Sequence, residues 1–199
     1  MSRSENIKLS KVSDKIIINE VEKLNGFISI DEVKDSQQNR NNIYGVDKLH
    51  NDINMLLGID YILVMKIGNS YQTLYIDTKG FNYNPKYNGT IRNGVVTTVL
   101  LQIEKYYGGK LLKGWANNPK YWTDFIIILL NNHLYYMNYQ RLMEYCNQLE
   151  HEQGTSIIQF NKYNGNYEKC IIANVDDMIN QRVITSIKPI ADTINNHIA

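Results

Sequence analysis

Residues 58–80, GIDYILVMKIGNSYQTLYIDTKG, carry two carboxylates and an ammonium group on runs that are otherwise mostly apolar. Asp60 stands near the start of the first run, and Asp77 and Lys79 stand near the end of the second. Mg²⁺ in proteins takes one or two carboxylates and keeps several waters. A lysine beside such an ion can orient or activate a water next to a phosphate. These residue types therefore indicate a divalent-metal site that acts on a phosphate ester.

The two runs must pair if these groups are to meet. IDYILVMKI and YQTLYIDTKG are typical of strands, and GNS between them is typical of a hairpin turn. Side chains alternate between the two faces of a strand, so Asp77 and Lys79 project together. Counting outward from Asn69 by about nine residues in each direction reaches both acids, which predicts that Asp60 lies beside Asp77. The alternative is a surface hairpin with an ordinary salt bridge.

The pattern GID…YIDTKG resembles the signature of the PD-(D/E)xK metal-dependent nucleases, which have a restriction-endonuclease-like fold. In that family an acid from the second core strand and an acid-x-lysine from the third form the site. The resemblance implies that Asp60, Asp77 and Lys79 are catalytic and that the two aspartates bind Mg²⁺ or Mn²⁺. Ile59 stands where the signature has proline. The implied function is cleavage of nucleic acid by a Mg²⁺-dependent phosphodiesterase, above all a DNA endonuclease.

Members of this family often add a glutamate from the first helix. In SDKIIINEVEKLNGF, residues 13–27, the apolar stripe places Glu20 at its edge and Glu22 on the opposite side. A glutamate on the inward side of a helix needs a partner, and a shared metal would be one. Glu20 is therefore predicted as a further catalytic residue and metal ligand, against the alternative that it reaches solvent. Asp52, close to the hairpin in sequence, is the rival.

Basic and aromatic residues gather in FNYNPKYNGTIRNG, residues 81–94. Lys86 and Arg92 suit contacts to phosphates, and the tyrosines suit base stacking. We predict that both cations bind nucleic acid, and the alternative is a solvated loop.

The remaining chain predicts the elements that position the hairpin. Helical stretches are expected at residues 13–27, 95–109, 140–153 and 175–187, and further hairpins at 122–139 and 155–175. Ser13 or Asp14 would cap the first helix. The resembled family often carries a polar residue toward the metal on the helix after the acid-x-lysine strand, and Gln102 and Lys105 are the candidates that this implies. This order predicts a mixed α/β (α+β) class: a central mixed sheet flanked by helices, with a restriction-endonuclease-like core and an added C-terminal hairpin and helix. We expect one nuclease-like domain over residues 1–199.

The composition is that of a globular protein, with 43% hydrophobic and 21% charged residues in 199. A net charge of +1 gives no overall signature of a nucleic-acid binder, although a local basic groove is compatible with it. Neither cysteine has metal-ligand spacing, and no apolar run approaches the ~20 residues that span a bilayer. The expectations are a cytoplasmic protein (host-cell cytoplasm for a phage or virus chain), no membrane partner, DNA favoured over RNA, and a possible homodimer. The alternative function is a catalytically inactive nucleic-acid- or protein-binding module on the same fold.

Overall fold

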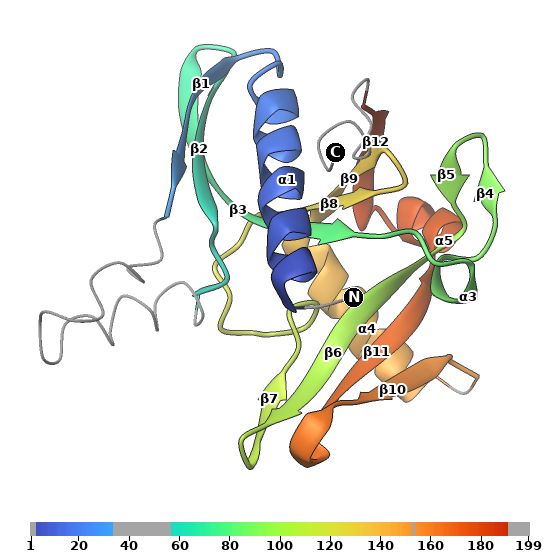
Figure 1. The fold of residues 1–199 in the computed structure, drawn as a ribbon. Coiled ribbons are helices and arrows are strands. Elements are labelled where there is room, and N and C mark those ends of the chain that lie inside the picture. The colour runs from blue at the N-terminus through green and yellow to red at the C-terminus, as the bar shows by residue number, and fades with distance from the viewer. Residues whose placement is uncertain (1–2, 34–56, 153, 191–199) are drawn as a thin grey trace, which may run out of the picture.

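The computed structural model describes residues 3–33, 57–152 and 154–190, and its main element is a six-stranded mixed sheet (Figure 1). In order across the sheet the strands are β1 (Phe27–Glu32), β2 (Tyr61–Ile67), β3 (Ser70–Phe81), β8 (Phe125–Leu130), β9 (His133–Asn138) and β12 (Ile184–Pro189). β3 and β8 are parallel, and all other neighbouring strands are antiparallel.

The predicted β2–β3 hairpin is confirmed. Ile67 pairs with Ser70 across the turn, and Tyr61 pairs with Ile76 toward the open end. The GFISI segment supplies β1, which extends the hairpin into a three-stranded meander. TDFIIILL supplies β8, parallel to β3, so that Asp77 lies level with Ile126.

A second, four-stranded antiparallel sheet has the order β10 (Ile157–Asn161), β11 (Tyr167–Asn174), β6 (Thr98–Tyr107) and β7 (Lys110–Lys113). The short elements are α3 (Pro85–Asn88), the pair β4 (Ile91–Arg92) and β5 (Val95–Val96), the 3₁₀ turn η2 (Tyr163–Gly165) and α5 (Val175–Asn180). Two long helices, α1 (Arg3–Val21) and α4 (Tyr139–His151), complete the described elements.

Two apolar cores hold these layers together, one on each face of the six-stranded sheet. On one face α1 packs Ile16, Ile17 and Val21 against alternate residues of β2, β3 and β8. On the other face the second sheet and α4 cover Ile126 and Ile128 of β8. The architecture is thus mixed α+β around a large central mixed sheet with few helices, which is the coarse class that the sequence predicted.

The helix predicted over residues 95–109 is wrong, because this segment forms β5 and β6. Val99, Leu101 and Ile103 are buried while the residues between them are partly exposed, which is the two-residue period of a strand. The β-branched run VVTTV favours this outcome. Gln102 and Lys105 therefore lie on a strand, and a sheet rather than a helix connects β3 to β8.

Two helix boundaries also differ from the prediction. α1 begins at Arg3, so Ser13 and Asp14 lie inside it and cap nothing. At the other end of the chain only Val175–Asn180 is helical, with the Asn174 side chain as its cap, and residues 184–189 form the edge strand β12. No helix in the described parts of the chain has the length and apolar character needed to cross a bilayer.

Candidate functional site

Asp60, Asp77 and Lys79 converge at the open end of the β2–β3 hairpin. The Asp60 backbone N–H donates to the carbonyl of Ile76 at 2.8 Å, which continues the strand pairing by one residue and sets Asp60 beside Asp77. The two carboxyl groups are close enough that the Asp60 charge helps to raise the pKa of Asp77. Lys79 Nζ lies 2.5 Å from Asp77 Oδ1. The juxtaposition predicted from the turn and the strand period is therefore present.

Thr78, between the two motif residues on β3, faces the opposite side of the strand, toward α1. Its backbone N–H donates to Asp60 Oδ2 at 2.9 Å. Its hydroxyl lies 3.0 Å from the same oxygen and 2.9 Å from Oδ1 of Asp14 on α1. A hydroxyl has a single proton to donate, so it can satisfy only one of these two carboxylates at a time. Thr78 thereby links Asp14 to the strand acids.

The three acids titrate differently. Burial, together with the neighbouring Asp60 charge, raises the pKa of Asp77 to about 8 although Lys79 opposes the change. Burial acts in the same direction on Asp60, but Lys79, the contact with Asp77 and the bonds from Thr78 outweigh it and lower the pKa of that carboxyl. Burial raises the pKa of Asp14. At neutral pH the Asp60–Asp77 pair therefore holds about one proton, and Lys79 balances the remaining negative charge.

One carboxylate oxygen of the pair is left without a donor. Asp77 is 2% exposed, and its Oδ2 is buried with no hydrogen-bond donor in reach. A buried carboxylate oxygen that faces a second carboxylate needs a shared proton or a cation between them. Two aspartates with such an oxygen suit Mg²⁺, which accepts one or two carboxylates and fills its other positions with water and substrate phosphate. Within the described ranges, no group of three or more His, Cys, Asp or Glu side chains is placed to hold a metal ion.

The segment that leads into Asp60 is fixed from outside the hairpin. Gly58 has φ of +63°, and a Cβ there would lie 2.2 Å from the ring of Tyr121. The Trp122 backbone N–H donates to the carbonyl of Leu57 at 2.8 Å, and the Thr123 hydroxyl donates to that of Gly58. The 121–123 segment, which precedes β8, thus positions Asp60, and Tyr121 is close enough that the charges of Asp77 and Lys79 act on its pKa.

The structure does not bring Glu20 to this cluster. Its carboxylate pairs with Lys23 at 2.6 Å on the same helix, and the predicted contact with the strand acids is absent among the described residues. Glu22 is exposed, as predicted. The helix acid that reaches the cluster is Asp14, one of the two residues predicted to cap the first helix. Asp52 lies outside the described residues.

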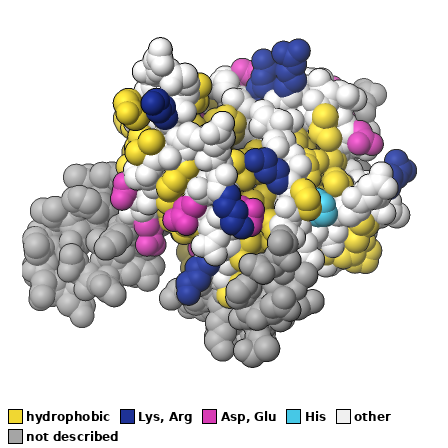
Figure 2. Space-filling view, turned by 90° about the horizontal axis from the view of Figure 1, so that it is seen from above, with side chains coloured by type: hydrophobic (Ala, Val, Ile, Leu, Met, Phe, Trp, Pro, Cys, Tyr) yellow, Lys and Arg dark blue, Asp and Glu magenta, His cyan; other side chains and the backbone are white. Residues whose placement is uncertain are grey.

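Lys86 and Arg92 are both exposed, on α3 and β4 respectively. Lys86 Nζ lies 5.2 Å from the centroid of the Tyr87 ring. On the face shown in Figure 2, acidic and basic side chains are interspersed among hydrophobic ones, in keeping with the balanced net charge.

Signals for Asp14 and Tyr121 differ in how visible they are in the sequence. Asp14, Ile17, Ile18 and Val21 share the 0, 3, 4, 7 spacing of one helical face, so the inward position of Asp14 was readable once the helix was known to start earlier. Nothing in the local sequence marks Tyr121, because its contact with Gly58 joins segments more than 60 residues apart.

No family model, curated protein or solved structure matches this chain.

Proposed function

We propose that this protein is a Mg²⁺- or Mn²⁺-dependent phosphodiesterase that cleaves nucleic acid, with DNA favoured over RNA. The observation that carries the proposal is the buried Asp77 carboxylate, which has Asp60 as a charged neighbour, Lys79 against Oδ1 and no donor for Oδ2. An ordinary surface salt bridge has no reason to bury a second acid in contact with the first. Asp60 and Asp77 are the proposed metal ligands.

The order of the strands supports a PD-(D/E)xK type of nuclease. The family core begins with a helix and three strands, and here α1 is followed by β1, β2 and β3. Asp60 directly precedes the second of these strands, and Asp77 and Lys79 lie on the third, as the resemblance requires. The chain departs from the family pattern after β3, where β6 and β7 replace the second core helix before β8.

The chain's own groups divide the chemistry between them. Lys79 supplies a fixed positive charge, because Asp77 and Asp60 raise its pKa although burial opposes them. Such a charge can orient a water and stabilise the charge that builds on the phosphate. A divalent ion held by the two aspartates would lower the pKa of a bound water and polarise a phosphate oxygen.

Asp14, rather than Glu20, is the α1 acid that lies beside the strand acids. Its Oδ1 reaches Asp60 only through the Thr78 hydroxyl, so we assign it a positioning role rather than direct contact with the ion. Loss of its carboxylate would free the Thr78 proton for Asp60 and shift the charge available at the pair.

The experiment is a cleavage assay on labelled single-stranded, duplex and branched DNA and on RNA, with Mg²⁺, Mn²⁺ or EDTA. Wild type is compared with Asp77→Asn and Lys79→Gln, and with Asp31→Asn on the exposed part of β1 as the matched control. We expect metal-dependent cleavage that both site variants lose and the control retains. Cleavage that survives EDTA or Asp77→Asn refutes the assignment.

One observation favours the inactive binding module as a second candidate. Lys79 already occupies Asp77 Oδ1 at 2.5 Å, and a third acid is not placed to complete a metal centre in the described chain. Titration of the protein with Mn²⁺ by calorimetry separates the two functions. Binding that Asp77→Asn abolishes supports the nuclease, and no binding together with no cleavage supports the module.

A further inference from the structure

The four-stranded sheet has an outer face turned away from the core. Leu101 of β6 and Ile171 of β11 pair directly and point inward. Further along these strands, past an irregularity in the register, Lys105 of β6 pairs with Glu168 of β11 on one side and with Leu112 of β7 on the other. Glu168 in turn pairs with Phe160 of β10. Directly paired residues in a sheet share a face. These four residues, with Tyr107 two positions after Lys105, define the outer face.

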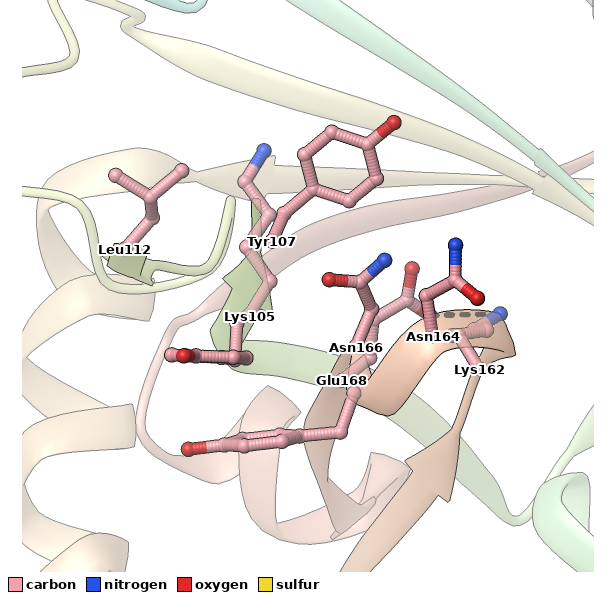
Figure 3. A pocket seen from close by; sticks show the side chains of 9 residues that line it. Lys105, Tyr107, Leu112, Lys162, Asn164, Asn166 and Glu168 are labelled. Carbon is pink, nitrogen blue, oxygen red and sulfur yellow. Dashed lines mark ion pairs between the residues drawn. The ribbon is translucent and has the colours of Figure 1, made fainter. Parts of the chain in front are cut away.

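A pocket of about 630 Å³ opens at one end of this face, where the β6–β7 turn meets the β10–β11 turn. Figure 3 shows the side chains of Lys105 and Tyr107 on one side of it, with the amides of Asn164 and Asn166 across from them. The Asn166 Oδ1 accepts from the backbone N–H of Gly108 at 3.1 Å, which ties the two turns together. Two hairpin ends thus form one recess.

The recess presents an aromatic ring and a cation that the described protein leaves unused. Tyr107 is 70% exposed. Lys105 has no salt-bridge or hydrogen-bond partner among the described residues. Lys162 also lines the recess and lies 3.1 Å from Glu168, the one acid of the lining, with half of its own side chain exposed. The lining therefore has a surplus of positive charge beside a free aromatic face.

A second set of the same kind lies along the same face. Tyr87 of α3 contacts Phe160 edge-on, with ring centroids 5.2 Å apart. Lys86 projects over the Tyr87 ring and is exposed. Phe160 is on the outer face, so the two sets of cation and aromatic ring lie at separate points along it. Lys86 is one of the cations that the sequence predicted for nucleic-acid contact.

We propose that this outer face binds single-stranded nucleic acid, with a base stacked on Tyr107 and phosphates bound by Lys105 and Lys86. Aromatic side chains stack bases without regard to sequence, while lysines follow the backbone. The positive charge, the exposed ring and the presence of such a pair at two points of the face favour a polyanion that carries flat rings. The proposal deepens the proposed function and rests on it, because it names single strands as the form of nucleic acid that the protein holds.

The test measures binding of a labelled 12-nucleotide oligothymidylate by fluorescence anisotropy. The buffer contains EDTA so that metal-dependent cleavage cannot occur. The altered protein carries Lys105→Gln and Tyr107→Ala. The matched control carries Lys66→Gln and Tyr71→Ala, a lysine and a tyrosine that pair across β2 and β3, with Tyr71 68% exposed. Circular dichroism and thermal unfolding check that both proteins fold.

We expect the Lys105/Tyr107 protein to bind at least tenfold more weakly, since one stacked base alone accounts for about 5- to 150-fold. The slope of log affinity against log salt should fall by about 0.7 for the lost lysine. The control should bind within about twofold of wild type. Equal affinity for all three proteins, stronger binding to duplex than to single strands, or no oligonucleotide binding overturns the proposal.

The outcomes separate this proposal from the nuclease. Metal-dependent cleavage with unchanged oligothymidylate binding in the Lys105/Tyr107 protein refutes the outer face and leaves the Asp60–Asp77 site intact. Weakened binding in that protein, with no cleavage by wild type, supports the face and refutes the nuclease.

Discussion

Replacing Asp77 by asparagine should remove a pH-dependent loss of stability. In the folded protein Asp77 Oδ1 faces Lys79, Oδ2 is buried without a donor, and the Asp60 charge acts on this carboxyl. An asparagine can keep its oxygen toward Lys79 and turn its N–H₂ group toward the Asp60 carboxylate. The asparagine would then form hydrogen bonds to both Lys79 and Asp60 at every pH, whereas the aspartate can do so only while it holds a proton.

The sign follows from the pKa of Asp77, which folding raises from 3.8 to about 8. The folded state binds this proton more tightly than the unfolded chain, so its contribution to stability is complete below pH 3.8 and is lost as the pH rises toward 8. At about 1.4 kcal/mol per pH unit, the ceiling is about 6 kcal/mol. Because the pair with Asp60 titrates jointly, we expect about 1–3 kcal/mol of the unfolding free energy to be lost.

The assay is urea unfolding in EDTA at pH 5, 6, 7, 8 and 9. The free energy of unfolding of wild type should fall across this range, and that of Asp77→Asn should fall less and exceed wild type at pH 8. Asp14 remains in both proteins, and its raised pKa acts in the same direction, so it cancels in the comparison. Parallel curves for the two proteins would refute the account of the buried pair.

Adding the metal provides an independent check on the same pair. A cation between the two carboxylates replaces the shared proton, so Mn²⁺ should restore stability to wild type at pH 8 but not to Asp77→Asn. Mn²⁺ at tenfold its Kd would add about 1.4 kcal/mol. The same gain in both proteins would place the metal elsewhere.

Three further changes test the surroundings. Asp14→Asn should lower the cleavage rate by about tenfold or more, while Glu20→Gln on the same helix should leave it within about twofold, and equal effects would remove Asp14 from the site. Gly80→Ala should cost about 1–3 kcal/mol in urea unfolding, because the new Cβ would lie 2.2 Å from Ser13 Oγ, and Ser13→Gly should restore part of the loss. Ile128→Ala, in the fully buried centre of β8, should cost about 2–5 kcal/mol, and a loss below 1 kcal/mol would contradict the described core.

The hairpin and its charged groups were readable from sequence because they depend on local rules. A two-residue period and a turn fix which side chains share a face, and this is enough to bring Asp60 to Asp77. The same rules predicted α4 and the β8–β9 and β10–β11 hairpins correctly.

The failures have non-local causes. The 95–109 segment is long and apolar enough for a helix, but its pairing with β11 selects the strand, and that partner lies about 70 residues away. Glu20 was predicted from its place at the edge of the apolar stripe, while Asp14 was considered only as a cap of the helix. The close approach of α1 to β3, where Ser13 meets Gly80, sets which turn of the helix reaches the site, and sequence periodicity contains no such information.

The path of the chain between the two sheets has a consequence for folding. After β3 the chain leaves the large sheet to form β6 and β7 of the second sheet, and it returns to the large sheet at β8. Between β9 and β12, both in the large sheet, it forms β10 and β11 of the second sheet. Neither sheet is therefore encoded by one continuous stretch of sequence. A protease cut or stop codon near Gly154 would remove strands from both sheets at once. Native pairing of Val99 with Ala173 must also await closure of a loop of more than 70 residues. We expect slow folding, and a single transition in which both sheets are lost together.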